Sequence, residues 1–167
     1  GRALRPGEPQ REQLVVHPVG ADLAYNVETY LTPGRYYRLS RGQSTPTALE
    51  VTSPVKFDDV EVVRQFATSR DGARVPVNII RKKGLRLDGS HPALLYGYGG
   101  YGINQTPGFL GGVRRVWFDA GGVYAVANIR GGGEYGPAWH QAALKQHRQR
   151  AYDDFIAVAE DLIARKV

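Results

Sequence analysis

A segment rich in glycine and tyrosine carries the densest chemical signal of the sequence. Residues 96–102 hold four glycines and three tyrosines, and they continue the apolar run 92–96. Glycine lets the backbone turn sharply close to a bound molecule. A tyrosine hydroxyl held in such a turn can donate a hydrogen bond to an oxygen that becomes negatively charged during a reaction. The segment therefore predicts a loop that stabilises an oxyanion.

The same segment has two other interpretations. Gly97, Gly99 and Gly102 match the G-x-G-x-x-G pattern of dinucleotide-binding loops. Nucleotide binding needs a helix that begins at the loop and points its N-terminus at the phosphates, and residues 103–108 do not start an amphipathic helix. The other alternative is a tight glycine turn with packed tyrosines and no ligand.

A second glycine cluster follows the apolar run that begins at Val123. Its centre is Gly131, Gly132 and Gly133, flanked by Arg130 and Glu134. Glycines let a loop pack closely against a neighbouring loop, so these five residues predict a structural loop, with direct substrate contact as the alternative. We expect Arg130 and Glu134 to form an internal ion pair.

Residues that activate nucleophiles or hold metals are scarce. The chain has no Cys, which excludes disulfides, a thiol nucleophile and cysteine-ligated metals. None of the five serines lies in a G-x-S-x-G turn, so no activated serine is recognisable. The four histidines form no H-E-x-x-H motif, and we expect Trp139 and His140 to pack locally. The sequence thus predicts neither a metal site nor a cofactor.

The charge balance is basic, with 22 Lys and Arg against 16 Asp and Glu. The cations are spread along the chain, and residues 81–83 form their one cluster. This distribution is typical of a solvated surface, so we expect no nucleic-acid partner. Apolar runs are far shorter than the ~20 residues of a membrane helix, so we expect no membrane partner either.

The elements that position these motifs follow from the apolar pattern. Short runs at 14–17, 23–31 and 35–39 predict antiparallel strands, and the character changes near residues 53–54. Next come a hairpin with an Asp-Gly turn (60–67 and 75–81), and apolar runs at 92–96 and 123–129. Continuous apolar runs predict strands covered on both faces. Residues 106–120 between the two runs have helical character towards their end.

The last segment predicts a helix. Its apolar stripe has helical spacing, and two acids, Asp153 and Asp154, are expected in its first turn, where they would complement the helix dipole. The stripe consists of Tyr152, Phe155, Ile156, Ala159, Leu162 and Ile163. This order of elements, a hairpin, a strand, a crossover, a strand and a helix, predicts the first part of an α/β sheet.

The stretches 88–100 and 127–140 resemble the prolyl oligopeptidase (prolyl endopeptidase) family of serine peptidases. The resemblance continues through residues 153–155 to the chain end and, more weakly, back through 30–34. It implies a seven-bladed β-propeller joined to an α/β-hydrolase domain. Residues 1–53 would end the last blade as antiparallel strands, and residues 54–167 would open the hydrolase sheet. The chain lacks Met and begins with Gly1, so we expect an excerpt of a longer protein.

The resemblance also implies an activity. The parent would be a monomeric, cytoplasmic enzyme, with an exported bacterial form left open, that cuts short peptides after proline through an acyl-enzyme. Tyr98 matches the family's oxyanion tyrosine. Tyr101 stands where the family usually has Phe, in the wall of the pocket for the substrate's proline. The nucleophile motif is expected beyond Val167, so this chain alone is predicted to be inactive.

A non-catalytic interaction module is the alternative from another class of function. The strand at 92–96 lacks its expected neighbour, which predicts an unpaired edge and an uncovered apolar face. We therefore expect the chain to self-associate through that edge. A monomer that unfolds cooperatively would favour the module instead.

Overall fold

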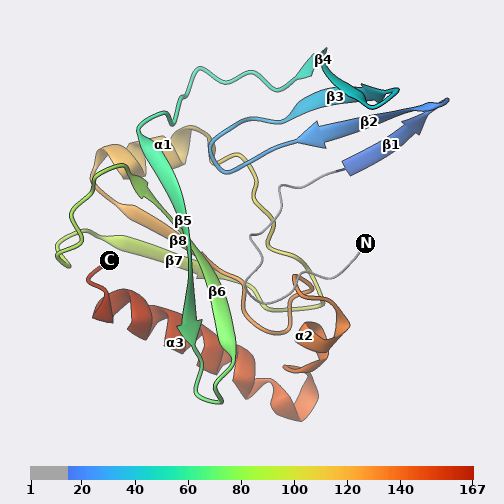
Figure 1. Cartoon of the computed structure of the whole chain (residues 1–167). Helices are drawn as coiled ribbons and strands as arrows, with labels where there is room; N and C mark the ends of the chain where they lie inside the picture. Colours follow the sequence, from blue (N-terminus) through green and yellow to red (C-terminus); the bar gives the residue numbers. More distant parts are fainter. Residues whose placement is uncertain (1–14) are drawn as a thin grey trace. The chain divides into compact units, whose positions relative to one another are not determined.

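The computed structural model describes residues 15–167 of the chain (Figure 1). These residues form two compact units. The first unit holds the described residues up to Asp58 together with Thr106–Val116, and the second holds Asp59–Gln105 and Trp117–Val167. Residues 1–14 of the predicted domain 1–53 lie outside the described residues, as does the first residue of the strand predicted at 14–17. The division into domains 1–53 and 54–167 stays a prediction.

A four-stranded antiparallel sheet forms most of the first unit. Its strands pair in chain order: β1 (Val15–Val19), β2 (Asp22–Val27), β3 (Arg35–Ser40) and β4 (Gln43–Glu50) (Figure 1). The predicted antiparallel arrangement is confirmed. The sequence pattern does not indicate β4, because most of its side chains are polar and exposed and Pro46 interrupts it. Proline is tolerated there because β4 lies at the edge of its sheet.

A later part of the chain completes this first unit. The backbone N–H of Phe109 donates to Glu28 Oε1 at 3.0 Å, and that of Leu110 donates to the carbonyl of Tyr30 at 3.1 Å. The rings of Phe57 and Phe109 meet edge to face, with centroids 5.7 Å apart. The helix that follows, α1 (Gly111–Asp119), is the one predicted late in 106–120.

A mixed four-stranded sheet forms the second unit. Its order is β5-β6-β8-β7, with strands β5 (Val60–Thr68), β6 (Arg74–Lys82), β7 (Ala93–Gly97) and β8 (Val123–Ala127). The predicted hairpin is confirmed as the β5–β6 pair, and its turn closes where Ser69 N–H donates to the Ala73 carbonyl at 2.8 Å. β7 and β8 run parallel, as an α/β sheet requires.

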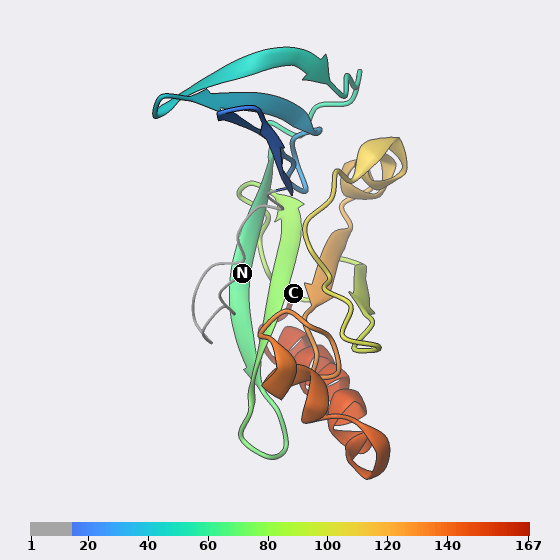
Figure 2. The ribbon, with the colours of Figure 1, turned by 90° about the vertical axis from the view of Figure 1, so that its right-hand side faces the viewer.

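The final helix, α3 (Gln149–Ala164), is confirmed, but its predicted apolar stripe is buried only in part. α3 contacts β5 and β6, and Figure 2 shows it in red beside these strands. Its buried residues are Ala151, Asp154, Val158 and Leu162, whereas three members of the predicted stripe are exposed: Tyr152, Ile156 and Ile163. The two acids also lie beyond the first turn, because α3 begins at Gln149. The carboxylate of Asp154 has a buried partner that sets this face of the helix, as described below.

The two parallel strands differ in their cover. Every residue of β8 is buried, as its continuous apolar run predicts. β7 is an edge strand that pairs with β8 alone among the described strands, and Leu94 and Tyr96 are 49% and 44% exposed. The prediction that both faces of β7 are covered is therefore wrong, whereas the predicted unpaired edge is confirmed. No helix within residues 15–167 is long and apolar enough to span a membrane.

We predict that the chain self-associates through β7. An exposed strand edge offers unpaired N–H and C=O groups to a second copy, and Leu94 adds exposed apolar surface. Leu94→Lys should weaken association several-fold in sedimentation equilibrium, because a charge on an edge strand opposes pairing. Val113→Lys, at an exposed position of α1, is the control and should change nothing. A monodisperse wild-type monomer at high concentration would contradict the prediction.

Candidate active site: two glycine loops at one sheet edge

Two loops meet at the carboxyl end of the parallel strands in the second unit's sheet. β7 and β8 are parallel neighbours, with Gly97 opposite Ala127 at their ends. Ligand sites of α/β sheets form at the carboxyl ends of parallel strands. The loop after β7, residues 98–105 (the first loop), therefore begins beside the loop after β8, residues 128–136 (the second loop). These are the two glycine segments that the sequence singles out.

The backbones of the two loops touch directly. The N–H of Gly102 donates to the carbonyl of Gly131 at 3.0 Å. A Cβ on Gly99 would lie 2.7 Å from the carbonyl oxygen of Arg130. A Cβ on Gly131 would lie 2.3 Å from the carbonyl oxygen of Gly99, and one on Gly133 would lie 2.2 Å from that of Gly102. No side chain fits between the loops at these points, so the predicted close packing of glycine loops is confirmed.

The first loop carries both tyrosines predicted to act on a substrate. Tyr98 is 40% exposed, and its ring lies against Gly100, where a Cβ would be 3.3 Å from the ring. Tyr101 is 87% exposed and has a backbone φ of 54°. Residues other than glycine rarely adopt this left-handed backbone conformation, and strained backbone of this kind is more frequent at functional sites. The structure thus brings Tyr98 and Tyr101 onto one exposed turn, and their catalytic and substrate-binding roles stay predictions.

Arg130 does not pair with Glu134 as the sequence suggested. Its guanidinium donates to both oxygens of Asp154, with Nε–Oδ2 at 2.9 Å and Nη2–Oδ1 at 2.6 Å, and its backbone N–H also donates to Asp154 Oδ2. A further contact joins Nη1 to Asp71 Oδ2 at 2.6 Å, in the β5–β6 turn. Asp154 raises the pKa of Arg130, and Arg130 in turn lowers the pKa of Asp71. One buried cation therefore joins a hairpin turn, the second loop and α3.

Glu134 instead joins the two loops. Its Oε1 accepts hydrogen bonds from the backbone N–H of Gln105 at 2.9 Å and from Asn128 Nδ2 at 3.3 Å. A Cβ on Gly132 would lie 2.2 Å from Glu134 Oε2, so glycine there leaves room for the carboxylate. Burial raises the pKa of Glu134 above its usual range, and the hydrogen bonds offset part of the effect. Arg130 and Glu134, at the two ends of the predicted structural loop, thus bind other parts of the second unit.

Three side chains that follow the second loop support both loops. Trp139 Nε1 donates to the Ile129 carbonyl at 3.2 Å, and His140 Nδ1 lies 2.7 Å from the Gly131 carbonyl. The local packing expected of Trp139 and His140 is confirmed. Arg148 Nη1 donates to the carbonyl of Gly99 in the first loop. Sequence reasoning missed Arg148 and Asp71, because no spacing pattern links either residue to its partner.

The described residues contain neither the loop-to-helix arrangement of a nucleotide site nor a cluster of metal ligands. No helix begins at Gly102, because the next helix, α1, starts at Gly111. Two short helices follow the second loop, α2 (Pro137–Gln141) and η1 (Lys145–His147). Within the described part of the chain, no three His, Asp or Glu side chains gather in a way that could hold a metal ion.

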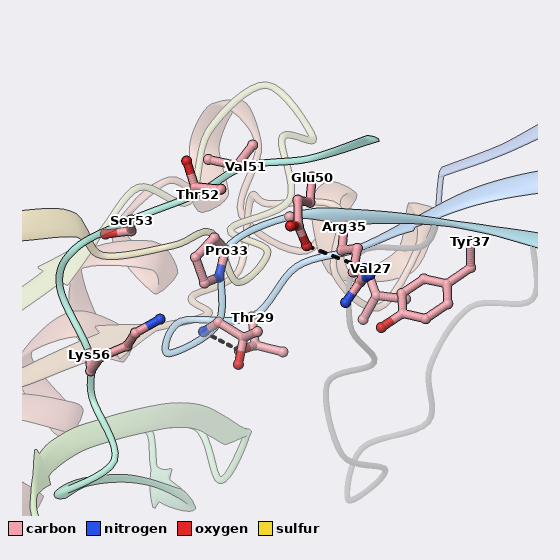
Figure 3. Close-up of a pocket in the computed structure, with 12 residues that line it drawn as sticks. Val27, Thr29, Pro33, Arg35, Tyr37, Glu50, Val51, Thr52, Ser53 and Lys56 are labelled. Atoms are coloured by element: carbon pink, nitrogen blue, oxygen red, sulfur yellow. Dashed lines mark hydrogen bonds and ion pairs between the residues drawn. The ribbon is translucent and has the colours of Figure 1, made fainter. Parts of the chain in front are cut away.

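A separate pocket lies within the first unit and contains none of the predicted site residues. Figure 3 shows it around the ion pair of Arg35 with Glu50, whose Nε and Oε2 are 3.4 Å apart. Thr29 Oγ1 accepts from the N–H groups of Leu31 and Thr32, which fixes the turn at one side of the pocket. Its polar groups therefore hold the end of the antiparallel sheet in shape.

We predict that the buried ion pair is the costliest single contact to break. Arg130→Gln leaves the buried carboxylate of Asp154 without its cation, and the free energy of unfolding should fall by about 3–5 kcal/mol. Arg150→Gln is the matched control, because Arg150 pairs with Asp71 at 3.8 Å on the surface, and its loss should cost about 1 kcal/mol or less. Urea denaturation measures both. Equal losses would show that Arg130 has no special structural role.

We predict a pH-dependent stability from Glu134. Its pKa is higher in the folded than in the unfolded chain, where it is near 4.5. The stability that protonated Glu134 contributes is fully present below that value and is lost as the pH rises through the folded-state pKa. Glu134→Gln should flatten this decline and keep an acceptor for Gln105. Glu160→Gln, on the exposed side of α3, should leave the profile unchanged. Thermal unfolding between pH 4 and pH 8 tests this, and an unchanged slope in Glu134→Gln would refute it.

Comparisons with known proteins agree on one family. Residues 111–167 match the model described as the prolyl oligopeptidase family. A prolyl endopeptidase of Elizabethkingia miricola is 42% identical over 143 residues, which are 84% of this chain and 20% of that protein. An uncharacterized peptidase of Sinorhizobium fredii is 49% identical over 118 residues, which are 70% of this chain and 16% of that protein.

Solved structures show the same likeness in three dimensions. One from a study of two prolyl endopeptidases superposes with a TM-score of 0.87 at 39% identity, over 93% of this chain and 23% of that one. A post-proline cleaving enzyme from Rickettsia typhi gives a TM-score of 0.81 at 32% identity, over 98% of this chain and 24% of that one. This chain spans about a fifth of the length of these relatives. It belongs to the prolyl oligopeptidase family of serine peptidases.

Proposed function

We propose that this chain is part of a longer serine-type oligopeptidase that cuts peptides after proline. In that enzyme it supplies a group that stabilises the oxyanion. The observation that carries the proposal is the backbone contact between the two glycine loops, which holds Tyr98 and Tyr101 at the carboxyl end of β7. A relative that is 42% identical is named a prolyl endopeptidase, and a solved structure with a TM-score of 0.81 is named a post-proline cleaving enzyme. These names support the proposed specificity for proline.

The chemistry of Tyr98 follows from its place on the loop. When a serine attacks a peptide carbonyl, the carbonyl oxygen becomes negatively charged in the tetrahedral intermediate. A preorganised hydroxyl stabilises that charge without having to reorient during the reaction. Gly99 and Gly100 leave the ring of Tyr98 at the loop surface, and Arg148 and Gly131 restrain the backbone beside it. Tyr98 is the proposed oxyanion donor, and the serine would come from outside these 167 residues, which contain no G-x-S-x-G turn.

The remaining parts of the proposal follow the same resemblance. The exposed ring of Tyr101 would form one wall of the pocket for the substrate's proline, with a hydroxyl where the family usually has none. Strands β1–β4 would end a β-propeller, and β5–β8 with α3 would open an α/β-hydrolase sheet. The partner would be a peptide: a related prolyl oligopeptidase of Galerina marginata has been solved bound to a 35mer substrate. We propose a cytoplasmic location, with no nucleic-acid or membrane partner and no cofactor.

A chimaera tests the role of Tyr98. The segment of the Elizabethkingia miricola enzyme that matches this chain would be replaced by this sequence, and labelling by a fluorophosphonate probe would confirm an active serine. Tyr98→Phe should then lower kcat/KM for a proline-amide substrate by about 10²–10³-fold, as the loss of other oxyanion donors does. Tyr96→Phe, on the exposed edge of β7, is the control and should leave kcat/KM unchanged.

The isolated chain provides the complementary result. It should neither hydrolyse the proline-amide substrate nor react with the fluorophosphonate probe, since it holds no recognisable activated serine. Stoichiometric labelling of the isolated chain would contradict a serine supplied from outside it, and an unchanged rate in the Tyr98→Phe chimaera would remove Tyr98 from the proposed role.

A further inference from the structure

A second hollow of the molecule adjoins Tyr101. It has a volume of about 590 Å³ and lies within the second unit, between the first loop and the stretch from α2 to the start of α3. Three of its lining side chains are basic or can become so, and none is acidic; the lining consists of Gly100, Tyr101, His140, Ala143, Leu144, Lys145 and Arg148. We call this hollow the basic pocket.

The charges around the basic pocket are unbalanced. Residues 135–152 contain three cationic side chains and two histidines but no acid. Lys145 is exposed and forms no ion pair within residues 15–167. A concave site lined by one sign of charge concentrates ions of the opposite sign. The basic pocket is therefore suited to an anionic group.

Two of the lining side chains are also held in place. Arg148 donates to the Gly99 carbonyl, and its guanidinium lies over the ring of Tyr152 at 5.3 Å. His140 is fixed by the Gly131 carbonyl. The backbone of Lys145 has a φ of 49°, in the left-handed region that non-glycine residues rarely adopt, and its side chain is exposed. Restrained side chains such as Arg148 lose less conformational freedom when they bind a ligand than freely moving side chains do.

The rest of the lining favours a peptide over a small ion. Leu144 and the ring of Tyr101 offer apolar surface beside Lys145 and Arg148, which suits a carboxylate on a carbon stem. We propose that the basic pocket binds a carboxylate of a peptide, either an acidic side chain or the C-terminus. This inference rests on the proposed function, since it adds a preference for acidic peptides to the site that Tyr98 and Tyr101 form.

Binding of short peptides to the ¹⁵N-labelled chain tests the proposal directly. The probes are acetylated, C-terminally amidated tetrapeptides that contain one proline and one glutamate, and the same peptides with glutamine. The glutamate peptides should bind about three- to tenfold more tightly, with shifts at the amides of Tyr101, Leu144 and Lys145. High salt should remove the preference, because exposed charges are screened. A glutamine peptide with a free C-terminus distinguishes a terminal carboxylate from a side-chain one.

Substitutions at Lys145 assign the preference to the basic pocket. Lys145→Gln should abolish it, and so should Lys145→Gly, which suits the left-handed backbone. Lys83→Gln removes the same charge from an exposed position outside the pocket and should keep the preference. Equal binding of glutamate and glutamine peptides, or a preference that survives both Lys145 variants, would overturn the proposal.

Two further binding measurements distinguish a failure of this inference from a failure of the proposed function. Inorganic phosphate that shifts the same amides at lower concentration than the glutamate peptides would overturn the carboxylate assignment. Peptides with alanine in place of proline test the function instead. If they bind as well as the proline peptides while the glutamate preference remains, the basic pocket stands and the proposed specificity for proline fails.

Discussion

The buried ion pair between Arg130 and Asp154 is the contact on which the second unit depends. A charge can be removed from water only where an opposite charge and hydrogen bonds replace its hydration. Arg130 meets this condition with both oxygens of Asp154 on α3 and with Asp71 in the β5–β6 turn. Three segments that are distant in the sequence are thereby held at the base of the second loop.

The rotation of α3 follows from this requirement. An apolar stripe of Tyr152, Ile156 and Ile163 matches helical spacing as well as the stripe that is buried. Turning α3 to bury that stripe would move Asp154 away from Arg130 and leave a buried cation without its strongest partner. The helix therefore buries Ala151, Asp154, Val158 and Leu162. The same rotation pairs Arg130 with Asp154 and buries Val158 and Leu162 in the core, so the charge pairing and part of the apolar packing act together.

The position of the exposed tyrosines depends on the same arrangement. The second loop, fixed by Arg130 and Glu134, presents the backbone against which Gly99 and Gly102 pack. The first loop then has little freedom, and Tyr98 and Tyr101 lie on its outer surface. Preorganisation of this kind is what an oxyanion donor needs, since groups already in place do not reorganise during the reaction. The same restraint on Arg148 and His140 shapes the basic pocket beside Tyr101.

The sequence by itself determined the family, the two glycine loops, the β5–β6 hairpin and the parallel pair of strands. These features depend on local chemistry: glycine permits the turns, and continuous apolar runs form strands. Only the tertiary structure decided the partner of Arg130, the buried face of α3, the exposed face of β7 and the contact of Arg148 with the first loop. Glu134 lies four residues from Arg130 in the chain, but its carboxylate is bound by Gln105 and Asn128 instead. Proximity in the sequence cannot select among carboxylates, because the pairing of a buried charge depends on which groups the whole fold brings within hydrogen-bonding distance.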